Sequence, residues 1–192
     1  MNTAELKTKI EQGVPGVKLR PVRESLLIEN PADLPKVAVF LKNSDLKLDY
    51  LSSVTAVDYL EYLESVYHLY SMEKKTVPIV LRARCTRENP KIPSLVPIYR
   101  GAEFQEREAY DLYGILYEGH PDLRRVFMWE GFVGHPMRKD YQQEDSETLE
   151  MADIEWLEKH GAKVPDEMRK KAEELKAQGK RAVAEKTGKS TE

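Results

Sequence analysis

Hydrophobic residues recur with two different periods along residues 17–113, and the change of period predicts where strands give way to helices. Residues 66–72 and 77–85 alternate between an apolar and a more polar face, the spacing of strands that bury one side. In the second segment Arg82 and Arg84 fall opposite the apolar row. Helical spacing is found earlier, at Leu34, Val37, Ala38 and Leu41.

The order of these segments predicts the fold class. Strands are expected at 17–20, 25–29, 47–59, 66–72 and 77–85, with helices beginning at 34 and 101. The first helix has two candidate N-caps, Asn30 and Asp33, and we predict Asp33 because it keeps Pro35 within the first turn. This order predicts an α+β fold with a mixed β-sheet and helices packed on one face.

The segment after the last strand carries a different set of signals. Pro90, Pro93 and Pro97 predict a loop or a very short helix. The helix expected at 101–113 ends before Gly114, a residue suited to a left-handed cap. Its expected apolar stripe consists of Ala102, Ala109, Leu112 and Tyr113, and its expected i,i+4 ion pairs are Glu103–Arg107 and Arg107–Asp111.

Charge divides the chain after Tyr141. The whole chain has 192 residues, with 33 acids and 30 bases, and residues 142–192 hold 13 of these acids, 10 of these bases and one aromatic residue, Trp156. We therefore predict an α+β domain over residues 1–141 and a charged, mostly helical C-terminal extension over 142–192. The apolar stripes of the extension are too thin to be stable alone, so we expect residues 146–187 to wrap a neighbouring chain.

Composition argues against several functional classes. A net charge of -3 makes nucleic acid a poor candidate partner. The single cysteine, Cys85, excludes a disulfide framework, a finger-type zinc site and a cysteine-ligated iron–sulfur cluster held by this chain alone. No apolar run approaches the roughly 20 residues needed to span a bilayer. The N-terminus lacks the apolar core of a secretory signal, so a reduced, cytoplasmic protein is expected.

The densest chemistry lies in residues 103–141. A Gly-His-Pro sequence occurs at 119–121 and again at 134–136, and two bases follow each copy closely. Glycine permits unusual backbone angles and proline fixes φ, so both turns should be stiff. The bases either bind a charged partner surface or pair internally with the acids of the preceding helix and tie the loop down. The two interpretations are compatible, and both remain open.

Three catalytic interpretations of the same residues are weaker. A metal site would need His120 and His135, together with His68 or an acid, but a 15-residue spacing matches no compact ligand motif. Cys85 lies in the apolar row of its strand, where a cysteine is usually a buried hydrophobe rather than a nucleophile. Glu106 and Glu108 do not face each other on a helix. The sequence has no Gly-rich phosphate loop.

Residues 106–115, Glu-Arg-Glu-Ala-Tyr-Asp-Leu-Tyr-Gly-Ile, closely resemble the signature of the 30 kDa subunit of respiratory complex I, the C-type subunit of NADH:quinone oxidoreductase. Residues 119–125 and 134–141 follow as they do in that family, and the resemblance covers roughly residues 35–141. Two features depart from the family pattern. Phe104 stands where tryptophan is common, and a charged tail begins at Gln142 where proline and a short extension are typical.

The resemblance implies a non-catalytic structural subunit in the hydrophilic arm of a membrane-bound, ion-translocating oxidoreductase, where it braces a hydrogenase-like large subunit beside an iron–sulfur small subunit. It implies no catalytic residue, metal or cofactor on this chain, and places iron–sulfur clusters, with nickel–iron or flavin as further options, on partner subunits. Membrane association would arise through those partners, on the cytoplasmic side of the cell membrane. One alternative is the equivalent subunit of an energy-converting nickel–iron hydrogenase or a sulfur-reducing complex. A remote alternative is a stand-alone metal-binding enzyme that uses His120 and His135.

The residues expected at the interface with partner subunits come from the helix at 101–113 and from the two turns that follow it. They are charged residues and histidines: Glu106, Arg107, Glu108, Asp111, His120, Asp122, Arg124, Arg125, His135, Arg138, Lys139 and Asp140.

Overall fold

The computed structural model describes residues 2–75, 77–129, 131–141, 151–161, 163–170 and 172–174. The chain divides into two compact units, Met1–Tyr141 and Gln142–Glu192. The first unit holds the β-sheet and nearly all of the buried hydrophobic residues.

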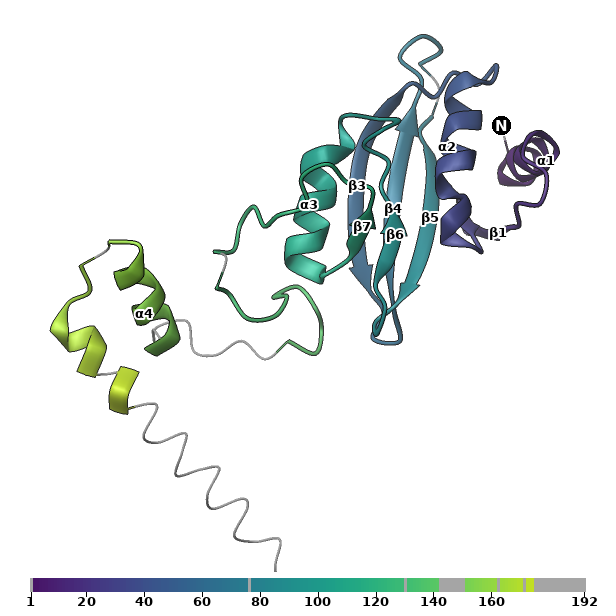
Figure 1. The fold of residues 1–192 in the computed structure, drawn as a ribbon. Coiled ribbons are helices and arrows are strands. Elements are labelled where there is room, and N and C mark those ends of the chain that lie inside the picture. The colour runs from purple at the N-terminus through teal and green to yellow at the C-terminus, as the bar shows by residue number, and fades with distance from the viewer. Residues whose placement is uncertain are drawn as a thin grey trace, which may run out of the picture. The chain divides into compact units, whose positions relative to one another are not determined.

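A five-stranded mixed sheet with the strand order β1-β2-β5-β4-β3 forms the first unit (Figure 1). Its strands are β1 (Leu19–Val22), β2 (Ser25–Ile28), β3 (Tyr50–Asp58), β4 (Tyr62–Tyr70) and β5 (Ile79–Thr86). Strands β2 and β5 are parallel, and the other neighbouring pairs are antiparallel. The chain crosses from β2 to β3 through helix α2 (Leu34–Asn43). The predicted mixed sheet and the predicted order of its strands around this helix are confirmed.

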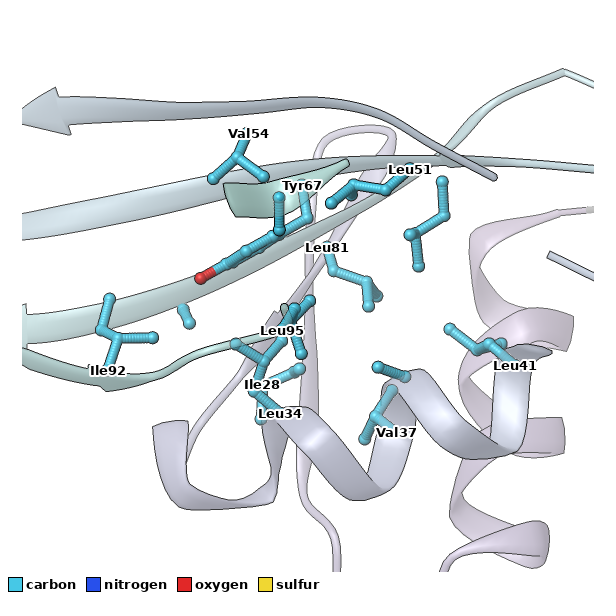
Figure 2. Packing of buried hydrophobic residues seen from close by; sticks show 14 of the residues in the cluster. Ile28, Leu34, Val37, Leu41, Leu51, Val54, Tyr67, Leu81, Ile92 and Leu95 are labelled. Atoms are coloured by element: carbon cyan, nitrogen blue, oxygen red, sulfur yellow. The ribbon is translucent and has the colours of Figure 1, made fainter. Parts of the chain in front are cut away.

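The hydrophobic core lies against one face of this sheet. Alternate residues of neighbouring strands, such as Val54, Tyr67 and Leu81, stand side by side in register and belong to a single buried cluster (Figure 2). Helix α2 adds the four residues of its predicted stripe, Leu34, Val37, Ala38 and Leu41. Burying a leucine or valine contributes about 1.5–3 kcal/mol, so this stripe holds the helix on the sheet.

The start of the chain differs from the sequence-based prediction. Helix α1 (Thr3–Gly13) was not predicted, although Asn2 and Glu5 form a capping box that marks its beginning. Asp33 is the N-cap residue of α2, as predicted, but its side chain makes no capping hydrogen bond. A 3-10 turn, η1 (Pro31–Asp33), precedes α2, and Asn30 caps this turn, with its Oδ1 accepting from the Ala32 N–H over 3.2 Å.

The stretch predicted as a proline loop contains a short strand. Strand β6 (Lys91–Pro93) pairs in parallel with β7 (Leu116–Glu118), so prolines permit an edge strand here. The side chains of Ile92 and Tyr117 are buried in the hydrophobic core and anchor this small sheet there. Strand β4 also begins earlier than predicted, at Tyr62. The prediction missed this start because the charged Glu64 interrupts the apolar pattern. Glu64 fits in the strand because it is paired with two arginines.

Helix α3 (Ala102–Tyr113) lies beside the edge strand β3 (Figure 1). Its predicted C-cap is confirmed, since Gly114 has a φ of 75°. The side that α3 buries differs from the predicted apolar stripe. Leu112 and Tyr113 are only half-buried, whereas the buried residues are Ala102, Glu106, Arg107, Ala109 and Asp111. A helix that buries three charged side chains needs partners for each of them.

The second unit contains helix α4 (Met151–Lys159), within the stretch predicted to be helical. Residues 166–170 and 172–174 are helical as well, within the extension predicted to be mostly helical. Residues 175–192 lie outside the described residues, as does part of the segment 146–187. Among the described helices, none combines the length and the apolar character required to traverse a bilayer.

Candidate functional site

The candidate site is built from α3 and the loop that follows β7, from Gly119 to Tyr141, which is described except at residue 130. We call this segment loop 119–141. It contains both Gly-His-Pro turns, and both of their glycines have positive φ angles, 86° at Gly119 and 85° at Gly134. The unusual backbone angles that the glycines were expected to permit in these turns are therefore present.

Glu106 is a fully buried carboxylate on α3. Its two oxygens accept hydrogen bonds from the Ser94 hydroxyl over 2.6 Å and from the Leu95 N–H over 2.7 Å. Burial raises the pKa of Glu106 to about 7, against the opposite effect of these two hydrogen bonds. The residue therefore fixes the loop before α3 to the helix, and it faces the protein interior rather than a partner.

Asp111 holds the backbone of loop 119–141 to α3. Its Oδ2 accepts three hydrogen bonds from consecutive backbone N–H groups, those of Val126 at 3.0 Å, Phe127 at 2.7 Å and Met128 at 2.9 Å. Its Oδ1 lies 3.4 Å from the Arg125 guanidinium, at the distance of an ion pair. One fully buried carboxylate thus fixes four successive residues, 125–128.

Arg107 binds the same loop from the same helix. Its guanidinium donates to the backbone carbonyls of Arg124, over 3.1 Å, and Arg125, over 3.4 Å. The expected ion pairs of Arg107 with Glu103 and Asp111 are not formed, because these carbonyls take its donors instead. Its one carboxylate neighbour among the described residues is Asp122, at 3.9 Å. Sequence spacing along a helix could not reveal partners that lie in a later loop.

The two turn histidines make hydrogen bonds that fix their tautomers. His120 Nδ1 accepts from the Asp122 N–H, so its Nε2 donates to the Glu103 carbonyl, each over 3.0 Å. His135 Nδ1 donates to the Asp111 carbonyl over 2.9 Å. Burial lowers the pKa of His135, and the nearby Arg138 and Arg125 lower it further. Both rings therefore act here as internal hydrogen-bonding groups.

Gly114 makes room for the second turn against the end of α3. A Cβ atom at Gly114 would stand 2.5 Å from the ring of His135 and 2.7 Å from the guanidinium of Arg138. Arg138 donates to the Tyr113 carbonyl over 2.6 Å, which satisfies an orphan carbonyl of the helix end. The glycine in the 106–115 motif is therefore required by close packing as well as by its φ angle.

A second buried aspartate, which the sequence did not single out, ties down the end of the loop. Asp58, at the end of β3, accepts from the Lys139 N–H over 2.8 Å, the Leu60 N–H over 2.7 Å and the Arg87 guanidinium over 2.5 Å. Arg87 also pairs with Asp140 over 2.5 Å. Burial acts to raise the pKa of Asp58, but these donors outweigh it and lower the pKa. No local sequence signal joins residues 58, 87 and 139.

The residues expected at an interface therefore separate into two groups. The hydrogen bonds and the ion pair of Asp111 join α3 to residues 125–128, which supports the interpretation that helix acids tie the loop down. The residues that face inward are Glu106, Arg107, Asp111, His120, Arg125, His135 and Arg138. The exposed members are Glu108, Asp122, Arg124, Lys139 and Asp140.

The loop also exposes large apolar side chains, which the sequence did not single out. Val133 is 84% exposed and Phe127 is 59% exposed, and Phe104 on α3 is 63% exposed. Other exposed apolar residues of the loop are Val126, Trp129 and Met137. We call these six residues the apolar patch. The signal in the sequence was an apolar run at residues 126–129, without helical or strand periodicity, directly after two arginines.

The catalytic alternatives find little support in this geometry. In the described ranges, no three histidine, cysteine or acidic side chains are grouped as metal ligands. Both ring nitrogens of His120 already have hydrogen-bond partners. Cys85 is buried, its Sγ donates weakly to the Leu63 carbonyl at 3.7 Å, and burial raises the pKa of its thiol to about 11.

Cys85 is expected to be unreactive in the folded protein. A buried thiol with a pKa of about 11 has almost no thiolate at pH 8, and the thiolate is the reactive form. Its reaction with DTNB should be at least about 100-fold slower than that of the urea-unfolded chain. A Thr55→Cys variant, which adds a thiol at an exposed strand position, provides the fast-reacting control. If Cys85 in the folded protein reacted with DTNB as fast as in the unfolded chain, a role as a nucleophile would again be open.

Comparison with known proteins relates this geometry to a family. The chain matches the family model for the respiratory-chain NADH dehydrogenase 30 kDa subunit over residues 27–147. It is 44% identical over 116 residues to the C 2 subunit of NADH-quinone oxidoreductase from Rhizobium meliloti (strain 1021), covering 58% of this chain and 62% of that protein. It is 41% identical over 117 residues to the C/D subunit of NADH-quinone oxidoreductase from Phocaeicola vulgatus, covering 60% of this chain and 22% of that protein.

A solved structure has a similar fold. A chain of an archaeal respiratory membrane complex, the membrane-bound sulfane sulfur reductase, superposes with a TM-score of 0.57 and 21% identity, covering 84% of this chain and 94% of that chain. The predicted α+β class is confirmed by this likeness. The alignments span less than two thirds of the two curated relatives. The resemblance based on residues 106–141 is confirmed by the family match, and the chain belongs to the respiratory-chain NADH dehydrogenase 30 kDa subunit family.

Proposed function

We propose that this chain is a non-catalytic subunit in the hydrophilic arm of a complex I-like, membrane-bound oxidoreductase, and that the apolar patch docks it against a partner subunit. The observation that supports this is exposed apolar side chains on a backbone that Asp111, Arg107 and Asp58 hold in place. Apolar residues surrounded by charged groups are typical of protein interfaces. A loop that is already ordered loses little conformational entropy on docking.

The relatives support a choice of partner. The Phocaeicola vulgatus protein is a combined C/D subunit in one chain, which is consistent with contact between its C and D parts. We infer that the large, hydrogenase-like subunit is the neighbour of the apolar patch, with the iron–sulfur small subunit in the same assembly. The redox groups would belong to those chains. Attachment to the cytoplasmic side of the membrane would also come through them.

The charged residues around the patch have a separate role in this proposal. Glu108 and Lys139 are exposed, so they can pair with charges of the partner and fix its orientation. Arg124 and Asp140 are also exposed, but they already pair with Asp122 over 2.9 Å and with Arg87 over 2.5 Å. The buried members of the set act indirectly, by holding the patch in shape. The C-terminal extension from Gln142 onward is proposed to wrap a neighbouring subunit.

The alternative is that the chain occupies the equivalent place in a hydrogenase or a sulfur-reducing complex. The fold likeness to a chain of the sulfane sulfur reductase is the observation behind this alternative. The subunits that co-purify with the tagged chain distinguish the two assignments. An NADH-binding flavoprotein among them identifies a complex I. A nickel-bearing large chain without that flavoprotein identifies a hydrogenase.

Val133→Asp is expected to reduce incorporation of the chain into the membrane complex by at least about tenfold, because it places a charge within the proposed apolar contact. Val77→Asp is a matched control, since Val77 is also 84% exposed but lies in the β4–β5 connection. Native-gel separation of membrane extracts measures incorporation. Equal incorporation of the two variants would contradict docking through the patch. Normal assembly with lost turnover would instead indicate a catalytic role.

A further inference from the structure

The sheet has a second face, opposite the core, on which arginine is concentrated. Arg20 pairs with Leu27, and Leu27 pairs with Arg82, so these residues share one face of the sheet. Arg84 lies on the same face, because it follows Arg82 by one full alternation of the strand. Arg23, in the β1–β2 turn, lines a pocket together with Arg82. We call Arg20, Arg23, Arg82 and Arg84 the arginine face.

This face carries a net positive charge, although the whole chain is negative. Among the strand residues that the structure describes, Glu64 is the one acid on it. Its carboxylate is fully buried and pairs with Arg82 over 2.5 Å and Arg84 over 2.7 Å. Glu24 in the turn offsets Arg23. A single carboxylate shared by two guanidiniums leaves some of their donors, and one positive charge of the pair, available to another acceptor.

A pocket of about 370 Å³ opens within the arginine face. Its lining includes Arg23, Ser25, His68 and Arg82. The Nδ1 atom of His68 is buried and has no hydrogen-bond partner among the residues that the structure describes. A buried polar atom of this kind calls for a partner. An incoming carboxylate could bind the guanidiniums of Arg23 and Arg82, which line this pocket.

We propose that the arginine face docks an acidic segment of a partner subunit, with one carboxylate entering the pocket at Arg23 and Arg82. Arginine suits this role because its planar guanidinium binds carboxylates in a bidentate manner. Charge complementarity selects an acidic polypeptide as the occupant. The apolar patch and the arginine face would then be two separate contacts of one assembled chain. The inference rests on the proposed function, because it requires that the chain be part of a complex.

The first test reverses charge on the exposed arginines. Arg82 and Arg84 are left intact because they hold Glu64. The double variant Arg20→Glu/Arg23→Glu is expected to lower incorporation into the complex by at least about tenfold, since it sets like charges against each other. Arg100→Glu, an exposed arginine outside the arginine face, is the control for charge and should assemble normally. Circular-dichroism melting verifies that each variant folds. Normal assembly of a folded double variant would overturn the proposal.

The second test identifies the occupant in the intact complex. Thr55 is exposed in the same row of the sheet as Arg82, because both pair with Val66. A photo-crosslinking residue at position 55 is expected to capture a segment of another subunit with net negative charge. A neutral or basic segment, this chain's own tail, or no cross-link would overturn the proposal.

These results are distinguishable from failure of the proposed function. If the wild-type chain is absent from every membrane complex, the proposed function fails. If the chain co-purifies with a complex and Val133→Asp releases it, but position 55 captures nothing, the proposed function stands and the arginine face alone is refuted.

Discussion

Asp111→Ala is expected to release loop 119–141 from helix α3 and to lower the free energy of unfolding of the first unit by about 3–5 kcal/mol. The substitution removes the acceptor for the backbone N–H groups of residues 126–128 and leaves the half-buried Arg125 without its carboxylate. Each orphaned group costs about 1–3 kcal/mol while it stays buried, so the loop should open to reach water. Trypsin cleavage after Arg124 and Arg125 should then accelerate by at least about tenfold.

Glu108→Ala provides the matched control, because it removes an acidic side chain that is exposed on the same helix. A surface substitution of this kind usually changes stability by less than about 0.5 kcal/mol. Urea denaturation followed by circular dichroism gives the unfolding free energies, and gel analysis of timed digests gives the cleavage rates. If the two variants behave alike, Asp111 does not hold the loop, and the apolar patch is not ordered before docking in the way proposed.

The strands and helix α2 could be predicted because their partners are encoded by local periodicity. The alternation at 77–85 places Leu81 and Ala83 in the core, and the stripe of α2 is buried as the spacing indicates. The prediction of strand boundaries failed where a buried polar side chain stood at a position that the pattern expects to be apolar. Glu64 hid the start of β4 because its partners, Arg82 and Arg84, come from another strand.

The candidate site shows the same limit more strongly. The sequence identified the residues of α3 and of both turns, and it left open whether their charges pair internally. It could not show that Asp111 accepts backbone N–H groups from residues 126–128, or that Asp58 holds Lys139. Such contacts join distant segments without any repeating pattern. Exposure of Phe127 and Val133 likewise follows from how the backbone is held, and not from the hydropathy of these residues.

Buried charge and exposed apolar surface have complementary roles in this arrangement. A globular domain normally buries its apolar residues and exposes its charges, and α3 with loop 119–141 reverses both tendencies. Desolvating Glu106, Arg107 and Asp111 has a cost that their hydrogen bonds offset only if the loop stays in place. The result is a loop that can display apolar side chains without collapsing onto its own domain.

Glu106→Gln is expected to make the first unit more stable at pH 8, and the gain should disappear in acid. Burial raises the pKa of Glu106 from an ordinary value of 4.5 to about 7 in the folded state. The folded protein therefore holds this proton more tightly than the unfolded chain does. The favourable contribution is fully present below pH 4.5 and is lost as the pH rises to about 7. Since a tenfold change in proton affinity is worth about 1.36 kcal/mol, the loss amounts to about 3 kcal/mol.

Glutamine reproduces the neutral carboxyl without titrating, and its carbonyl can still accept from the Leu95 N–H while its amide donates to the Ser94 hydroxyl. The unfolding free energy of the variant minus that of the wild type, measured in urea from about pH 4 to about pH 8, should rise from near zero to about 2–3 kcal/mol. Glu108→Gln, the same change at an exposed position of α3, should stay within about 0.5 kcal/mol throughout. A difference for Glu106→Gln that is flat with pH would mean that its carboxyl does not titrate in this range. A loss of stability at pH 8 would mean that the ionised carboxylate, bound by Ser94 and Leu95, is the form that the core requires.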